Sequence, residues 1–71
     1  MLLKVDGGIT KDAIVELLFR KQERGSDVII NAVGRDNKVH GRILSAGIER
    51  VVVKTDNGTE EISVDDIIEI D

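Results

Sequence analysis

The chain lacks cysteine, proline, tryptophan and tyrosine, and Phe19 is its only aromatic residue. Without cysteine it forms neither disulfides nor thiolate metal sites, and a single histidine cannot hold a metal ion alone. A chain of 71 residues has a core that is only marginally sufficient, so oligomerisation is the supplement that remains. We therefore expect an aliphatic core, no metal site and no cofactor.

Long apolar runs are also absent. No segment approaches the roughly 20 apolar residues that crossing a bilayer requires. The apolar start at residues 1–5 is too short for the core of a signal peptide, and no small-residue cleavage site follows it. The sequence predicts a soluble cytoplasmic protein with no membrane partner.

The charge is unevenly distributed along the chain. The formal net charge is −4. Binding of nucleic acid requires local positive potential, so this balance argues against a surface that is uniformly coated by RNA or DNA but leaves a local basic patch open. The last twelve residues contain no base and six acids, namely Glu60, Glu61, Asp65, Asp66, Glu69 and Asp71.

Residues 11–24 predict one helix. Thr10 is suited to the N-cap position, and Asp12 lies in the first turn, where a carboxylate interacts favourably with the helix dipole. Cations gather in the last turns, and Gly25 is placed to end the helix. Apolar residues at helical spacing form one face, with Ala13, Ile14, Leu17 and Leu18 at its centre and Val15 and Phe19 widening it.

The second half of the chain predicts five short strands. Apolar and β-branched residues at strand spacing occupy residues 28–33, 38–45, 50–55, 60–64 and 67–70. The strongest hairpin signal is the sequence Asp-Asn-Gly-Thr at 56–59, since Asn-Gly accepts the positive φ angles of tight turns. Two aspartates separate the last two strands as a short 3₁₀ turn.

Gly41 lies in the middle of the second predicted strand. In a strongly bent strand the backbones approach too closely for a side chain, so this glycine indicates a small curved barrel. The predicted fold class is α+β, mainly β, with an N-terminal helix followed by a five-stranded, strongly bent antiparallel barrel. We expect one domain over residues 1–71, with a tail at 1–9, the helix at 10–25 and the barrel at 27–71.

Residues 38–45 read Lys-Val-His-Gly-Arg-Ile-Leu-Ser. This stretch is similar to the Lys-Leu-Gln-Gly-Gln-Ile-x-Ser of the bacterial Hfq branch of Sm-like proteins. Residues 51–54 lie where that family has its apolar third strand, which often also ends in lysine. With its order of helix and strands, the chain resembles a divergent Sm-like protein, and the resemblance implies the Sm-like variant of the SH3-like barrel.

The resemblance also implies a partner, which is the chain itself. Sm-like proteins form closed homo-oligomeric rings of about five to eight subunits, in which the fourth strand of one subunit pairs with the fifth strand of the next. Exposed strand edges with apolar residues and no proline recruit such partners. The alternative is that the same apolar side chains fill the core of a monomer. The candidate interface residues are Ile62, Val64, Ile68 and Ile70.

The pore of such a ring departs from the family. The family binds uridine between the turn after the second strand and the turn before the fifth. The matching turns here, at 47–51 and 64–66, offer no ring to stack a base and place Asp65 and Asp66 where RNA needs donors. We expect uridine binding at the pore to be lost. Weak binding of a divalent cation by the two aspartates is the alternative to a solvated turn.

Two other surfaces carry candidate RNA-binding residues. Lys38 matches a lysine of the family's purine site, and His40 lies where a glutamine of that site reads adenine. The end of the helix is similar to the basic segment with which Hfq contacts RNA. The alternatives are that His40 has no binding role and that the helix cations merely suit a helix C-terminus. The candidates on the helix are Arg20, Lys21 and Arg24.

Catalysis has little support in the sequence. Adjacent acids such as Glu60 and Glu61 point to opposite faces of a strand, whereas general acid–base catalysis needs groups that converge. We therefore expect no catalytic residues and no enzyme activity. Two hypotheses remain: an Sm-like ring that binds RNA as a chaperone or regulator, and an Sm-like ring that serves as a protein-interaction scaffold without binding RNA.

Overall fold

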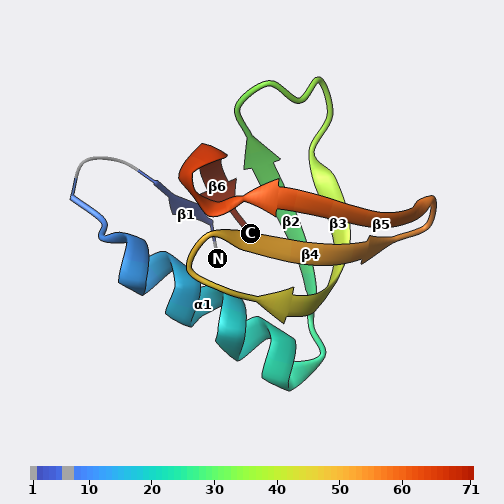
Figure 1. The fold of residues 1–71 in the computed structure, drawn as a ribbon, viewed down its shortest axis with the longest axis horizontal. Helices are drawn as coiled ribbons and strands as arrows, with labels where there is room; N and C mark the ends of the chain where they lie inside the picture. The colour runs from blue at the N-terminus through green and yellow to red at the C-terminus, as the bar shows by residue number, and fades with distance from the viewer. Residues whose placement is uncertain (1, 6–7) are drawn as a thin grey trace.

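The computed structural model describes residues 2–5 and 8–71. The protein contains one long helix and a six-stranded antiparallel sheet (Figure 1), so it is α+β and mainly β, as predicted. In chain order the elements are β1 (Leu3–Lys4), α1 (Lys11–Arg24), β2 (Asp27–Ala32), β3 (Val39–Ala46), β4 (Arg50–Thr55), β5 (Gly58–Ser63), the 3₁₀ turn η1 (Val64–Asp66) and β6 (Ile67–Ile70).

Helix α1 begins and ends where the sequence predicts. The Thr10 hydroxyl oxygen accepts a hydrogen bond from the backbone N–H of Ala13 at 3.2 Å, which makes Thr10 the N-cap. Gly25 ends the helix with a φ of 65°, a left-handed conformation that glycine adopts without a steric cost. Local capping signals therefore fix both ends of α1.

The buried face of α1 is narrower than predicted. Ile14 and Leu18 are buried, but Phe19 is 49% exposed. The predictions that Ala13 and Phe19 belong to the core-facing side are wrong, whereas Val15 and Leu17 are partly buried and pack against the core. Consecutive helical residues are rotated by about 100°, so a residue next to a buried one can face solvent. On the same helix, the Gln22 side chain donates to the Leu44 carbonyl at 2.9 Å and ties α1 to β3.

The five predicted strands are all present; β4 and β6 have the predicted ends, and the ends of the other three are shifted by one or two residues. The largest shift is in β5, which begins at Gly58 because Asp56 and Asn57 alone form the turn and Thr55 pairs with Gly58. Gly58 has a φ of 117°, and no non-glycine residue of the described chain has a positive φ. The positive φ of this hairpin therefore falls on the glycine alone.

A sixth strand lies within the segment that was predicted as a tail. In β1, Leu3 pairs with Ile70 and Lys4 pairs with Glu69. The backbone N–H of Val5 also donates to the Ile68 carbonyl at 2.7 Å. The prediction of five strands is therefore wrong by one, since a two-residue strand owes its existence to a partner at the other end of the chain.

The sheet has the order β1-β6-β2-β3-β4-β5 and is not closed, so it differs from the predicted barrel. Its curvature comes with register shifts between Asn31 and Ala32 in β2 and between Ile43 and Ser45 in β3. A Cβ atom added at Gly41 would overlap the Lys54 carbonyl oxygen of β4. This close approach confirms the reason predicted for the glycine.

The core lies between α1 and the concave side of the curved sheet and is aliphatic, as predicted. All of the buried side chains in the described chain are apolar. They come from α1, η1 and every strand except β1. The core residues are Ile14, Leu18, Val28, Ile30, Ala32, Val39, Ile43, Val51, Val53, Ile62, Val64, Ile67 and Ile70.

Candidate nucleic-acid interface

Strand β3 has an apolar inner face and a polar outer face. Val39 and Ile43 are buried, whereas His40 and Arg42 are exposed. Lys38, which immediately precedes the strand, is exposed and lines the same hollow as His40. The structure therefore brings the two candidates Lys38 and His40 together, and alternation along the strand adds Arg42.

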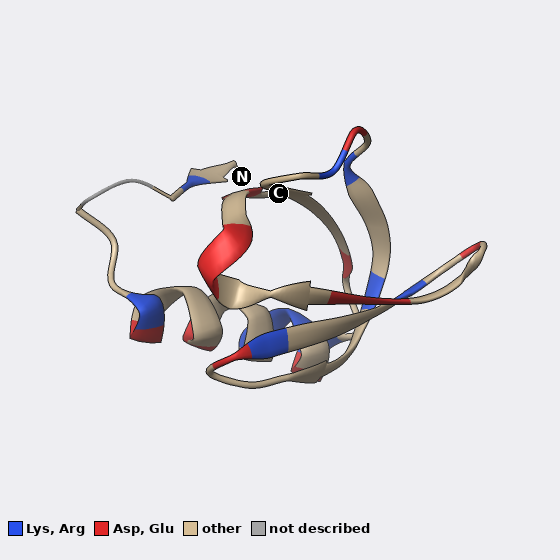
Figure 2. Cartoon of the chain, turned by 45° about the horizontal axis from the view of Figure 1, so that its top comes forward, with Lys and Arg blue, Asp and Glu red and all other residues tan. Residues whose placement is uncertain are grey.

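Strand β4 contributes a further cation. Lys54 is the register partner of Arg42, and both residues are exposed. With His40 they line a hollow of about 470 Å³. The Arg42 Nε donates to a carboxylate oxygen of Asp27 at 3.3 Å, which compensates part of this positive charge. Figure 2 shows blue segments along β3 and in the loop that precedes it.

Sequence reasoning did not select Arg42 or Lys54 as candidates. Arg42 continues the alternation that starts at Lys38, and that spacing was a sufficient signal. Lys54 lies 12 positions further along the chain and reaches this face only through the β3–β4 register. That register depends on the irregularity in β3 between Ile43 and Ser45, which the residue pattern does not reveal.

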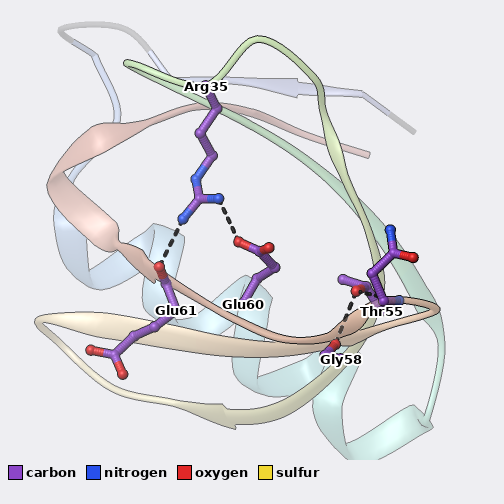
Figure 3. Close-up of polar contacts among 6 residues, drawn as sticks. Arg35, Thr55, Gly58, Glu60 and Glu61 are labelled. Carbon is purple, nitrogen blue, oxygen red and sulfur yellow. Dashed lines mark hydrogen bonds and ion pairs between the residues drawn. The ribbon is translucent and has the colours of Figure 1, made fainter.

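The hollow that Lys38 and His40 share has a volume of about 540 Å³ and lies between the β2–β3 loop and the β4–β5 hairpin. Arg35 spans the distance between the loop and β5 (Figure 3). Its Nη1 lies 2.6 Å from a carboxylate oxygen of Glu60, and its Nη2 donates to the Glu61 carbonyl at 2.9 Å. Arg35 is thus bound to β5, while Lys38 is exposed.

The opposite wall of this hollow is held by Thr55 (Figure 3). The Thr55 hydroxyl accepts a hydrogen bond from the Asn57 N–H at 3.1 Å and donates one to the Gly58 carbonyl at 2.9 Å. These two bonds stay within the hairpin and fix its tip. The turn at the tip of the β4–β5 hairpin, which forms this wall of the hollow, is therefore held by its own hydrogen bonds.

The three candidates on the helix also lie together. Arg20, Lys21 and Arg24 line one groove of about 660 Å³. The Arg20 guanidinium lies 2.7 Å from a carboxylate oxygen of Glu16 on the same helix, and both side chains are exposed. We call this surface the helix groove. Its apolar lining comes from Leu3, Ile9, Ala13 and Leu17.

The helix groove and the two hollows beside β3 have no lining residue in common. The candidate residues thus form two separate surfaces. One is the outer face of β3 and β4, which we call the β3 face and define by Lys38, His40, Arg42 and Lys54. The other combines three cations with an apolar floor.

The two aspartates predicted at the pore lie on η1, which is red in Figure 2. Both are exposed, and an Asp65 carboxylate oxygen lies 3.1 Å from the Lys11 Nζ at the start of α1. In the described part of the chain, His, Asp and Glu side chains do not gather in groups of three or more that could hold a metal ion. This end of the sheet is therefore acidic and partly compensated by Lys11.

Glu60 and Glu61 have different partners. Glu60 faces Arg35, whereas the Glu61 carboxylate points away from it in Figure 3 and lies 2.7 Å from the Arg50 Nη1. Each carboxylate is thus engaged by its own arginine. The two acids do not converge on one point.

The four candidate interface residues differ in exposure. Ile62, Val64 and Ile70 are at most 2% exposed, and Ile68 is 39% exposed. Three of the side chains therefore fill the core of the single chain, which is the alternative that the sequence left open. Contacts of these strands with a partner would be made by their backbone edges and by Ile68.

Comparison of the chain with models of protein families, with curated proteins and with solved structures finds no match. Over the residues that the structure describes, no helix combines the length and the apolar character needed to span a membrane.

Proposed function

We propose that the chain is an Sm-like, ring-forming module that binds RNA through the β3 face, with the helix groove as a second contact. The observation that carries this proposal is the gathering of Lys38, His40, Arg42 and Lys54 on one exposed side of two neighbouring strands, in a chain whose net charge is −4. The two hollows beside β3 are also lined by four acids, namely Asp27, Asp36, Asp56 and Glu60. The proposal therefore depends on the exposed cations as individual donors to phosphate oxygens and not on a net positive charge of the hollows.

The Sm-like part of the proposal is supported by the strand order. Strands β6, β2, β3, β4 and β5 follow one another in a single curved antiparallel sheet, with Gly41 at the point of closest approach. Strand β5 has β4 as its only strand partner in the described chain and so offers an edge to another subunit. We infer that this curved sheet is an open form of the small barrel that the sequence predicts.

In such a ring, RNA would contact the outer side rather than the pore. The acids of η1 would be repeated around the axis, and repeated carboxylates repel phosphates. The β3 face offers donors instead, since lysine, arginine and histidine all donate hydrogen bonds to phosphate oxygens or base edges. We propose binding without catalysis, because Asp27 and Glu60, two of the acids near this face, are each ion-paired with an arginine.

A protein-interaction scaffold is the second candidate. It is favoured by the six acids of residues 60–71 and by the position of Phe19, the only aromatic residue, on α1 rather than on the β3 face. Base stacking on an aromatic ring contributes much of the affinity of many single-strand binders. A scaffold would form the same ring and ignore RNA.

The experiment measures binding of fluorescently labelled A-rich and U-rich oligonucleotides by anisotropy, at several salt concentrations between about 50 and 200 mM. Arg42→Glu tests the β3 face. Arg50→Glu is the matched control, since both arginines are exposed and ion-paired with one acid. We expect Arg42→Glu to lower the affinity about tenfold and to reduce the salt slope by about 0.7 per lost phosphate contact, while Arg50→Glu leaves both unchanged.

The mass of the same samples, measured by light scattering, separates the hypotheses. An assembly that binds RNA in a salt-dependent manner supports the proposal. An assembly that ignores both oligonucleotides supports the scaffold. A protein that stays monomeric at every concentration contradicts the ring.

A further inference from the structure

Strand β6 is paired along both of its edges. On one edge it pairs with β2, where Ile30 faces Ile70 and Asn31 faces Glu69. On the other edge it pairs with β1, where Lys4 faces Glu69. In the predicted ring, the fifth predicted strand, which is β6, pairs through this second edge with the fourth predicted strand of the neighbouring subunit, which is its β5. Strand β1 therefore occupies the position of the assembly partner.

Strand β1 holds this edge by few interactions. It consists of two residues, and the backbone hydrogen bond from Val5 to the Ile68 carbonyl extends it by one position. Leu2, just before the strand, is 48% exposed, and Val5 is only partly buried against the core. Short terminal strands of this kind open at a small fraction of the global unfolding free energy.

Strand β5, which would pair with the β6 edge in a ring, is longer than β1. Strand β5 has six residues and lies at the opposite end of the sheet order from β1. In the single chain, part of its outer edge is satisfied by Arg35, whose Nη2 donates to the Glu61 carbonyl. Strand β6 has four residues, of which β1 and Val5 cover three, so a six-residue edge could pair along the whole of β6. Backbone groups left unpaired at an edge favour such pairing.

We propose that β1 is a displaceable cover of the β6 edge, and that self-assembly proceeds when β5 of a second copy replaces it. This inference rests on the proposed ring and adds the step that controls its formation. In the single chain, β1 pairs with the β6 edge, and Arg35 contacts one carbonyl of the β5 edge, that of Glu61. Assembly would then exchange these contacts for a ladder between subunits along the four residues of β6.

Charge makes this exchange sensitive to salt. Strand β1 places Lys4 opposite Glu69, an opposite-charge pair across the ladder. Strand β5 would instead bring Glu60 and Glu61 toward a strand that carries Glu69. Because salt screens both the attraction that holds β1 and the repulsion that opposes β5, assembly should strengthen as salt rises. RNA binding has the opposite dependence.

The decisive experiment locks β1 in place with a disulfide, using the double variant Lys4→Cys/Glu69→Cys. Since the Val5 N–H bonds to the Ile68 carbonyl, the adjacent pair Lys4 and Glu69 takes the non-hydrogen-bonded position, where antiparallel Cα atoms are closest. The natural chain has no cysteine, so no other disulfide can form within it. Analytical ultracentrifugation of the oxidised and reduced forms measures assembly over a range of concentrations.

We expect the reduced form to assemble and the oxidised form to remain monomeric at the same concentration. Equal assembly of the two forms would overturn the proposal for β1 while leaving the ring intact. A wild-type chain that never assembles would contradict the ring itself, and this inference with it. The two failures are therefore distinguishable.

A second variant tests the same step in the other direction. Val5→Pro removes the N–H that donates to the Ile68 carbonyl and so weakens the pairing of β1 with β6. Leu2→Pro, outside β1, is the matched control. We expect Val5→Pro to lower the concentration of half-assembly about tenfold and Leu2→Pro to leave it unchanged. Weaker assembly of Val5→Pro, with native circular dichroism, would show that β1 is part of the interface and would overturn the proposal.

Discussion

The Arg35 Nη1 lies 2.6 Å from the Glu60 Oε2, although 25 positions separate the two residues. The pair connects the loop after β2 to strand β5 (Figure 3). Strands β2 and β5 are not neighbours in the sheet. The same guanidinium also donates to the Glu61 carbonyl. Side-chain bonds thus join parts of the curved sheet between which no strand pairing is described.

Replacing Arg35 should destabilise the fold moderately. The Arg35 and Glu60 side chains are 31% and 42% exposed, so solvent weakens the ion pair, and we expect Arg35→Met to cost about 1 kcal/mol. Urea unfolding measures this cost. The control is Arg42→Met, whose pair with Asp27 is 69% and 62% exposed and should contribute less than about 0.5 kcal/mol. Equal losses of unfolding free energy in the two variants would contradict a larger contribution of the Arg35 contacts to stability.

Gly41 should tolerate no side chain. In Gly41→Ala the new Cβ would overlap the Lys54 carbonyl oxygen and lie 2.8 Å from the Lys54 carbonyl carbon. Because both atoms belong to the backbone of β4, the strands must move apart, and we expect a loss of about 3 kcal/mol. The control is Gly47→Ala, where the nearest atom outside the adjoining residues is 3.6 Å away. Thermal unfolding of the two variants measures the difference, and similar melting temperatures would contradict this account of the bend.

Two adjacent residues of α1 should differ in their contribution to stability. Leu18 is fully buried and Phe19 is 49% exposed. Leu18→Ala leaves a cavity and should cost about 3 kcal/mol, whereas Phe19→Ala should cost about 1 kcal/mol or less, although it removes the larger side chain. Denaturant unfolding tests the order. A larger cost for Phe19 would place it in an interface between subunits.

The two proposed RNA contacts should act independently. Because the β3 face and the helix groove have no lining residue in common, the effects of Arg24→Glu and Arg42→Glu on RNA binding should add as free energies. Anisotropy titration of the single and double variants measures this, with Arg50→Glu as the control. If one single variant binds like the natural chain and the double variant binds like the other single variant, only one of the surfaces contacts RNA.

The parts of the fold set by local chemistry were predictable. Thr10 and Gly25 determine the ends of α1 through hydrogen bonds and a backbone angle that depend on nearby residues. The alternation of Val39 and Ile43 with polar residues determines which face of β3 is buried. These signals lie within a few residues of the structure that they specify.

The parts of the structure that depend on contacts between distant residues were not predictable from the sequence. Strand β1 exists because Leu3 meets Ile70, and nothing near Leu3 encodes that partner. Lys54 joins the β3 face through a register that a strand irregularity shifts. Phe19 is 49% exposed although it adjoins the buried Leu18, since the helical pattern does not specify how wide a face the core covers.

The insertion of β6 between β1 and β2 also has a consequence for folding kinetics. Strands β2, β3, β4 and β5 pair with their neighbours in sequence. In β6, by contrast, Ile70 pairs with Ile30 and with Leu3, which are far from it in the sequence. Closing a long loop costs entropy before any contact compensates for it, and non-local pairing slows folding. We therefore expect amides of the β3–β4–β5 meander to gain protection before those of β6 in pulse-labelled hydrogen exchange, so that the strand at the proposed assembly edge is the last to be incorporated.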